Sequence, residues 1–273
     1  MLTYQTDTLL IITKTYPSPS KKYRETTCVA AINKKGKLRR LFPIPFRLLG
    51  GEFQFKRWEW IEAGVAKADK DHRPESYKLD TDSIIRHEKV GTESGWAERY
   101  YWIEPHIMDS FEQLEARRQN SGETLGFIRP NNCKLIITKA DNPDWTEEET
   151  NKLIQDGLFD PPEVKKRFPL RKVPYDFYYE YECQNKSESY TYQHKIIDWE
   201  VCSLYWNCQE LYGSNWEIYF RQKLEIEFSK NKDLIFLMGT IHRFPDQWLI
   251  VGLIYPPKTE ARQRPLFSLV PDA

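Results

Sequence analysis

A repeated pentapeptide is the feature that most limits what this chain can fold into. Residues 10–14 read LIITK, and the same five residues return at positions 135–139 of the 273-residue sequence. Each copy is a short β-branched run with a proline, Pro17 or Pro143, within the next four residues, a pattern typical of a strand that ends at a turn. The repeat therefore predicts two related modules, residues 1–130 and 131–273, with a boundary near Asn131.

Short extended segments separated by turn residues fill both halves. In the first half we expect strands at residues 9–15, 26–33, 37–42 and 55–68, and a helix at 105–119. In the second half we expect a capped helix after Thr146, alternating aromatic strands at 175–182 and 190–197, helical periodicity over 198–229, and a hairpin from 234 to 254. This pattern predicts a mainly β protein with α-helices (α+β), built as two OB-like small β-barrel modules with interspersed helices.

The charge distribution singles out the N-terminal segment. Lys and Arg number 40, and Asp and Glu also number 40, so the net charge is zero. Residues 10–58, however, hold twelve basic residues and two acidic ones. Such a local excess predicts a polyanion-binding surface, although basic loops can also be merely solvated.

Two loops within this segment combine cations, aromatic rings and prolines. In a small barrel such loops suit single-stranded nucleic acid, because cations neutralise phosphates and aromatic rings stack on bases. Phe42 and Ile44 fit the barrel core better, and strand alternation over residues 37–41 places one arginine toward the core, where it would need an acidic partner. The predicted nucleic-acid-binding residues are Lys14, Tyr16, Lys21, Lys22, Tyr23, Arg24, Arg39, Arg40, Phe46 and Arg47.

A second, weaker binding site is predicted at the last hairpin. His242, Arg243 and Trp248 lie in or beside its turn, so a cation and an aromatic ring could meet a nucleic acid there. A histidine in a turn is more often an ordinary surface residue.

Catalytic and metal-binding patterns are weak in this sequence. Cys183, His194, Cys202 and Cys208 lack the paired spacing of zinc sites, so we expect no metal and no cofactor. A metal-dependent nuclease stays open as an alternative, and its candidate residues are Asp71, Glu75 and Lys78, or Asp198 and Glu200. We expect no catalytic residues, because there is no Gly-rich phosphate loop and no Gly-x-Ser-x-Gly motif.

Several segments together resemble the prokaryotic dual OB-containing domain proteins. They are residues 12–17 (ITKTYP), 27–32 (TCVAAI), 41–47 (LFPIPFR), 197–200 (IDWE) and 236–240 (FLMGT). The resemblance implies two OB-like barrels and nucleic-acid binding, in mobile-element or antiviral defence settings where another protein supplies catalysis. OB barrels also bind proteins and sugars, so the fold alone does not decide the ligand.

We therefore expect a non-catalytic, nucleic-acid-binding adaptor that favours single strands and whose acidic second half docks a protein partner. A pure protein-interaction subunit is a further alternative. No apolar run reaches about 18 residues, no secretory signal is evident, and the five cysteines are widely spaced. These features predict a cytoplasmic protein without a membrane span.

Overall fold

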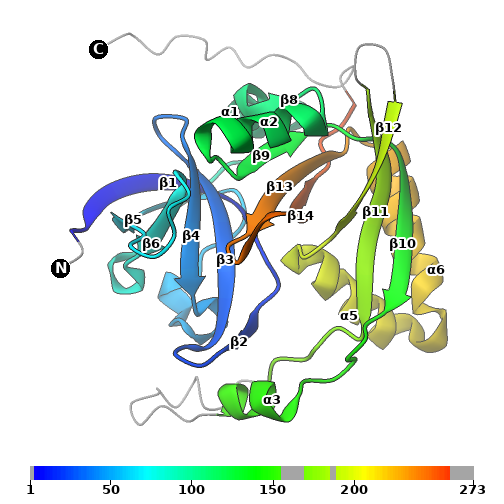
Figure 1. The fold of residues 1–273 in the computed structure, drawn as a ribbon, viewed down its shortest axis with the longest axis horizontal. Helices are drawn as coiled ribbons and strands as arrows, with labels where there is room; N and C mark the ends of the chain where they lie inside the picture. The colour runs from blue at the N-terminus through cyan, green and yellow to red at the C-terminus, as the bar shows by residue number, and fades with distance from the viewer. Residues whose placement is uncertain (1–2, 155–168, 185–188, 259–273) are drawn as a thin grey trace.

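Five strands of the first half close into a small barrel. The computed structural model describes residues 3–154, 169–184 and 189–258. β1 pairs antiparallel with both β3 and β5, and β3 pairs antiparallel with β4. β4 pairs parallel with β6, and β6 pairs antiparallel with β5, which completes the circle. This arrangement is that of an OB-like barrel (Figure 1). The barrel strands are β1 (Gln5–Lys14), β3 (Arg24–Asn33), β4 (Leu38–Ile44), β5 (Glu59–Lys67) and β6 (Ser76–Leu79).

Shorter elements decorate the barrel. β2 (Ser18–Ser20) pairs with β3, and β7 (Ile85–Lys89) pairs with β5. The 3₁₀ turns η1 (Phe46–Leu48) and η2 (Gly51–Phe53) connect β4 to β5, and η3 (Thr81–Ser83) follows β6.

The repeated pentapeptide forms a strand in both places where it occurs. In β1 both faces of the strand are buried, because Leu9 and Ile11 point into the barrel while Leu10 and Ile12 pack against the second half of the chain. Double burial explains why this run is continuously apolar instead of alternating. The second copy lies in β10 (Asn131–Lys139), where Leu135 is buried.

The rest of the chain contains a three-stranded sheet and a four-stranded sheet, the latter including two strands that precede residue 131. The three-stranded sheet has the order β10-β11-β12, and the four-stranded sheet has the order β14-β13-β9-β8. A parallel bridge between Ile196 and Ile250 joins the two sheets. Across this bridge the strand order β10-β11-β12-β14-β13 corresponds to the barrel order β1-β3-β4-β6-β5. These strands do not close into a second barrel, because β13 pairs with β9 and not with β10. The further strands are β8 (Ile107–Met108), β9 (Leu125–Ile128), β11 (Tyr175–Gln184), β12 (Ser189–Lys195), β13 (Ile235–Ile241) and β14 (Phe244–Ile254).

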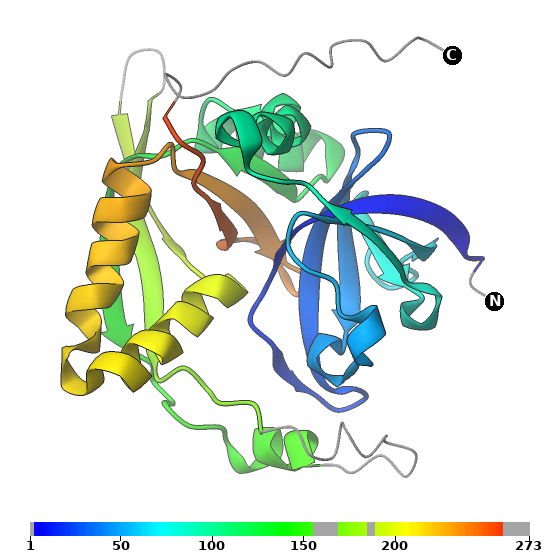
Figure 2. The same cartoon turned by 180° about the vertical axis from the view of Figure 1, so that it is seen from behind.

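Helices cover the outer faces of this second module. α5 (Trp199–Tyr212), α6 (Trp216–Arg221) and the π-helix η6 (Gln222–Lys230) lie against the β10–β11 sheet (Figure 2). Aromatic side chains fill this core, as when Tyr179 stacks on Phe236 with ring centroids 5.2 Å apart. None of the described helices is long and apolar enough to span a membrane.

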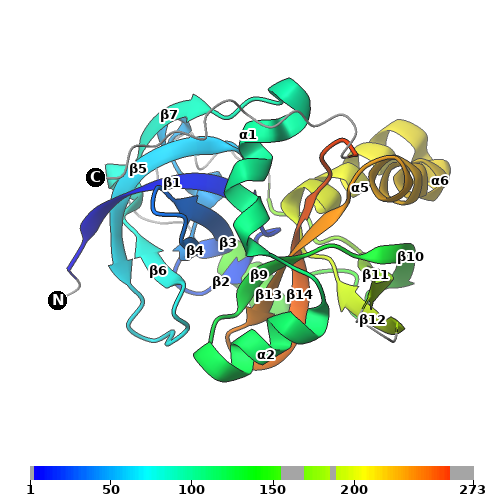
Figure 3. The same ribbon diagram turned by 90° about the horizontal axis from the view of Figure 1, so that it is seen from above.

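The predicted helix at residues 105–119 is displaced in the structure. α1 (Glu93–Ile103) ends before it, η4 (Glu104–His106) and β8 follow, and α2 occupies Phe111–Ser121. Ser110 sets the start of α2, because its hydroxyl accepts a hydrogen bond from the backbone N–H of Gln113. α1 and α2 lie over the junction of the two halves (Figure 3).

The fold class predicted from the sequence is confirmed as a mainly β structure with helices and a small closed barrel. The module boundary near Asn131 stays a prediction. The capping box after Thr146 is present at α3 (Glu147–Ile154), where Glu149 N–H donates to the Thr146 hydroxyl at 3.2 Å.

Candidate binding cleft

A cleft of about 730 Å³ lies between the barrel and the second module. Its walls come from β3 and β4, from the loops before β3 and before β6, from β11 and β12, and from the turn between β13 and β14. We call this the central cleft. The lining residues used below are Tyr16, Arg40, Phe42, Arg73, Trp145, Lys172, Asp176, Lys195, His242 and Arg243.

The barrel contributes the face that OB-like barrels use for oligonucleotides. In that fold the second and third strands and two loops, one after the first strand and one before the fifth, form the ligand surface. Here these elements are β3, β4, the β1–β3 connection with Tyr16, and the β5–β6 loop with Arg73, and all four line the central cleft.

Phe42 is the exposed aromatic residue on this face. Along β4 the side chain of Leu41 is buried inside the barrel, so Phe42 points outward and is 46% exposed. The sequence placed Phe42 in the barrel core, and this prediction was wrong. An exposed ring on a ligand-binding face can stack on a planar ligand.

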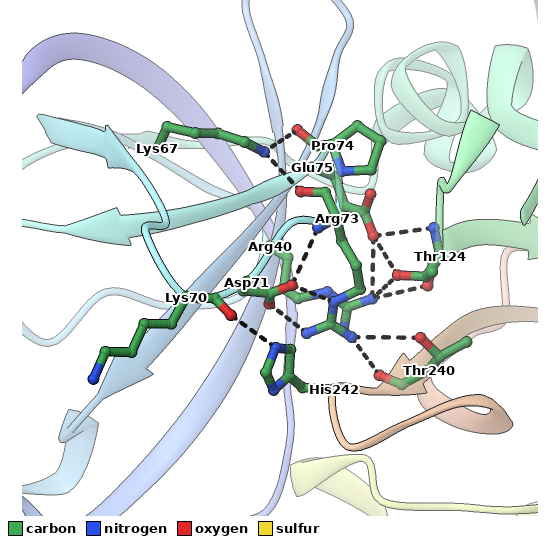
Figure 4. A network of polar contacts seen from close by, with 10 residues as sticks. All are labelled: Arg40, Lys67, Lys70, Asp71, Arg73, Pro74, Glu75, Thr124, Thr240 and His242. Atoms are coloured by element: carbon green, nitrogen blue, oxygen red, sulfur yellow. Dashed lines mark hydrogen bonds and ion pairs between the residues drawn. The ribbon is translucent and has the colours of Figure 1, made fainter.

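Arg40 is buried at the edge of the cleft and has an acidic partner. Its Nη2 lies 3.4 Å from Glu75 Oε1 and donates to the Thr124 carbonyl at 2.8 Å (Figure 4). The Thr124 backbone N–H donates to the same Glu75 oxygen at 3.1 Å. This network connects the barrel to the start of β9, so the role of Arg40 is structural. The Arg40 side chain lines the cleft but is almost fully buried.

Arg73 makes a second tie beside the first. Its Nη2 lies 2.6 Å from Asp71 Oδ2, and its Nη1 donates to the Thr240 carbonyl at 2.8 Å (Figure 4). Burial would raise the pKa of Asp71, but the bonds from Arg73 and Ser76 outweigh it and hold that pKa well below its usual value. Asp71 is therefore ionised at neutral pH.

The opposite wall carries further cations. Lys195 Nζ lies 2.7 Å from Asp176 Oδ1, and Lys172 Nζ lies 5.0 Å from the ring centroid of Trp145. His242 Nε2 lies 3.0 Å from the Lys70 carbonyl oxygen, and the side chain of Arg243 is exposed. The lining contains five Lys and Arg side chains and one acidic side chain, but four of these cations pair with a carboxylate in or beside the cleft: Arg40 with Glu75, Arg73 with Asp71, Lys172 with Glu149 and Lys195 with Asp176. The excess of positive charge at the cleft is therefore small, and the exposed Arg243 contributes to it.

Tyr16 connects the two modules at the cleft. Its backbone N–H donates to the Ile197 carbonyl at 2.8 Å, and its hydroxyl donates to the Arg171 carbonyl at 2.9 Å. Trp206 Nε1 donates to the same hydroxyl at 3.1 Å. Tyr16 thus lines the cleft, as one predicted binding residue, and also fixes its geometry.

Lys14 and Phe46 lie in a different cavity, of about 520 Å³. Lys14 Nζ stands 4.2 Å from the centroid of the Phe46 ring and donates to the Phe55 carbonyl at 3.2 Å. Burial lowers the pKa of Lys14 to about 8, although nearby Glu200 raises it. These two predicted residues do not meet the central cleft.

Four predicted residues sit at the turn between β2 and β3. Lys21 and Lys22 are exposed, and Tyr23 and Arg24 are half-buried. Arg24 Nε donates to the Leu153 carbonyl in α3 at 3.4 Å. This turn therefore contacts α3, and its four residues are not among those that line the cleft.

The remaining predicted residues are dispersed. Arg39 forms an ion pair with Asp7 at 3.5 Å, and Arg47 forms one with the buried Glu25 at 3.3 Å. Trp248 is buried and donates to Glu115 Oε2 at 2.8 Å, so it belongs to the core of the second module. Of the predicted residues, the structure brings Tyr16, Arg40, His242 and Arg243 together at the central cleft.

The candidate nuclease carboxylates have structural partners. Asp198 is fully buried as the N-cap of α5, and its oxygens accept from the backbone N–H groups of Glu200 and Leu253 at 2.6 and 2.9 Å. Burial raises the pKa of Asp198, opposed by Arg57. Lys78 pairs with Asp69 at 2.7 Å.

The zinc candidates do not gather into a site. Within residues 3–154, 169–184 and 189–258 no three His, Cys, Asp or Glu side chains are placed to hold a metal ion. His194 instead lies 3.0 Å from the Tyr181 hydroxyl, and burial lowers its pKa to about 4.

Several cleft residues were missed by the sequence. Arg73, Trp145, Lys172 and Lys195 come from four separate segments, and no local motif marks them. The loops that hold Arg73 and Trp145 have the composition of ordinary turns, so only the tertiary fold reveals that both line the same cleft.

Comparison with known families divides the chain near residue 106. Residues 107–271 match the family described as Domain of unknown function (DUF8757), and residues 5–105 match the one described as Domain of unknown function (DUF8758). The first match spans more than half of the chain. No curated protein shows significant similarity to it.

Proposed function

The chain belongs to the DUF8757 family, and we propose that its central cleft binds a short single-stranded segment of nucleic acid. The observation that carries this proposal is the exposed ring of Phe42 on the β3–β4 face of an OB-like barrel, opposite a wall of cations. A stacking ring and phosphate-binding cations on facing walls are what single-strand binding requires.

The positions of the basic side chains around the cleft support a polyanionic ligand. Arg243, Lys172 and Lys195 approach from the second module, and Arg73 approaches from the barrel. The bonds of Arg73 and Lys195 to Asp71 and Asp176 fix where those cations lie. Each cation that neutralises a phosphate releases a counterion, so binding weakens as salt rises.

The aromatic lining favours unpaired bases over a duplex. Phe42, Trp145 and Tyr16 can only stack on bases that are free of a double helix. A volume of about 730 Å³ also suits a few nucleotides and is too small for a helix of base pairs.

The proposed role is that of a binding subunit that presents nucleic acid to a partner protein. A binding role without catalysis is supported by the carboxylates around the cleft, because Asp71, Glu75 and Asp176 each bond to a basic side chain of the wall and are therefore not free to hold a catalytic metal ion. Carboxylates engaged in this way hold the cleft together.

Fluorescence anisotropy tests the proposal with labelled single-stranded and duplex oligonucleotides at low and physiological salt. Phe42→Ala should weaken single-strand binding by about 1 to 3 kcal/mol, the contribution of one stacked base. Tyr101→Ala is the matched control, because Tyr101 is 49% exposed and lies outside the cleft.

A charge reversal completes the design. Arg243→Glu should weaken binding and reduce its salt dependence, whereas Lys35→Glu, on an exposed turn outside the cleft, should change binding less. Equal effects of Phe42→Ala and Tyr101→Ala, or no binding at low salt, would refute the proposal.

A further inference from the structure

The central cleft is surrounded by one continuous set of contacts between distant parts of the chain. The barrel contacts α3, and the segment before α3 joins it to the β10–β12 sheet (Figure 1). That sheet is bridged to β14, and β14 and β13 lead back to the barrel. We call the described residues 140–154 and 169–174, which connect β10 and β11, the arm.

The arm contacts the barrel through α3. α3 packs on β2 and β3, and Arg24 Nε donates to the Leu153 carbonyl at 3.4 Å. The first turn of α3 is acidic and approaches the basic β2–β3 turn. The pKa of Glu148 is lowered, mainly by its bond to Lys152 and to a smaller extent by Lys21 across this contact.

The arm is also fastened to the second module and to Tyr16. The Arg171 guanidinium lies 4.0 Å from the ring centroid of Trp206, and the Arg171 carbonyl accepts from the Tyr16 hydroxyl at 2.9 Å. Trp145 Nε1 donates to the Leu170 carbonyl at 2.8 Å, which holds the two legs of the arm together.

On the far side of the cleft the β13–β14 turn closes the circle. Arg73 Nη1 donates to the Thr240 carbonyl at 2.8 Å, and His242 Nε2 lies 3.0 Å from the Lys70 carbonyl oxygen (Figure 4). Both contacts join the β5–β6 loop of the barrel to the second module.

We infer that the central cleft takes the free end of a single strand, in preference to an interior segment. The inference rests on the proposed function. A strand without a free end can enter an encircled cleft only as a loop of its interior, with two lengths of backbone side by side. Two phosphate backbones side by side repel each other, and the cleft has room for a few nucleotides only.

Linear and circular oligonucleotides of the same length and sequence test this inference, with the wild-type chain and anisotropy at low salt. The circle should bind about tenfold more weakly or worse, the loss expected when at least one stacked base cannot be reached. A linear strand with a bulky protein attached at each end should behave like the circle.

The outcomes separate the two proposals. If no linear strand binds, the proposed function itself fails. If the linear strand binds and the circle binds equally well, the proposed function stands and the preference for an end is refuted.

A pair of variants tests the part played by the arm. Lys21→Glu with Lys22→Glu places negative charge opposite the acidic turn of α3 and should move the circle-to-linear affinity ratio toward one. Lys35→Glu with Lys37→Glu makes the same change of charge at an exposed turn outside the cleft and should leave the ratio unchanged. The same ratio in both variants would contradict a restricting arm.

Discussion

Replacing Arg40 by methionine removes one partner of a buried ion pair and leaves the other. The Arg40 and Glu75 side chains are only 5% and 6% exposed. Without the guanidinium, Glu75 keeps two donors, the backbone N–H and the hydroxyl of Thr124, and loses its counter-charge. The Thr124 carbonyl loses the Arg40 donor at 2.8 Å as well and keeps the Thr240 backbone N–H at 3.2 Å.

The expected cost is about 3 to 5 kcal/mol of unfolding free energy, which is typical when one member of a buried pair is removed. In a domain of this size such a loss lowers the melting temperature by roughly 10 °C. The double variant Arg40→Met with Glu75→Leu should lie closer to the wild type than Arg40→Met does, because no uncompensated charge remains buried.

Urea unfolding followed by tryptophan fluorescence measures these differences. Lys35→Met is the control, since Lys35 is exposed, and it should change the free energy by less than about 0.5 kcal/mol. A loss of unfolding free energy below about 1 kcal/mol for Arg40→Met would refute the reasoning. So would a double variant whose loss exceeds the sum of the losses of the two single variants.

Three further predictions concern packing and protonation. Gly252→Ala should destabilise the junction of the modules by about 1 to 3 kcal/mol in the same unfolding assay, because its Cβ would come 2.8 Å from Thr13 Cγ2; an unchanged midpoint would contradict this. Burial lowers the pKa of His194 to about 4, below its unfolded value of about 6.5, so its contribution to stability is present above about pH 6.5 and is lost as pH falls toward 4. Unfolding of His194→Phe should therefore depend less on pH in this window, and an identical pH profile would exclude the assignment. The rate of acylation of Lys14, followed by peptide mass spectrometry, should reach half of its maximum near pH 8, the pKa to which burial lowers this amine, and level off above it, whereas a model lysyl peptide reaches half of its maximum only near about pH 10.

The barrel and four of its five strands could be predicted because they depend on local patterns, whereas the short β6, which closes the barrel, was not predicted. The LIITK run marks a strand in both places where it occurs, β1 and β10. β-branched residues and turn residues are read from a few neighbours, and small barrels follow from many short strands. The displaced α2 shows the limit of this reading, since its start depends on the hydroxyl of Ser110.

The central cleft could be predicted only in part, because its walls meet through long-range contacts. The basic N-terminal segment drew attention to Lys14, Arg39 and Arg47, whose side chains the fold engages with an aromatic ring or an acid. A charge count along the sequence does not show which cations have partners. Conversely, Lys172 and Lys195 lie far from that segment and reach the cleft through the pairing of β10, β11 and β12.

Phe42 illustrates the same limit for an aromatic residue. Its sequence neighbours are apolar, so a buried position is the natural prediction, and only the register of β3 and β4 shows that Leu41 takes the inward position. The register is fixed by strand partners that a linear pattern does not reveal.

Ultraviolet crosslinking of a labelled single strand to the wild-type chain, with the adducts mapped by mass spectrometry, tests the central claim most directly. Binding in the central cleft predicts adducts on Phe42, on Trp145 and in the His242–Arg243 turn, all of which line it. Adducts confined to other surfaces, such as the exposed Lys56 and Lys89 beside the second cavity, would contradict the account.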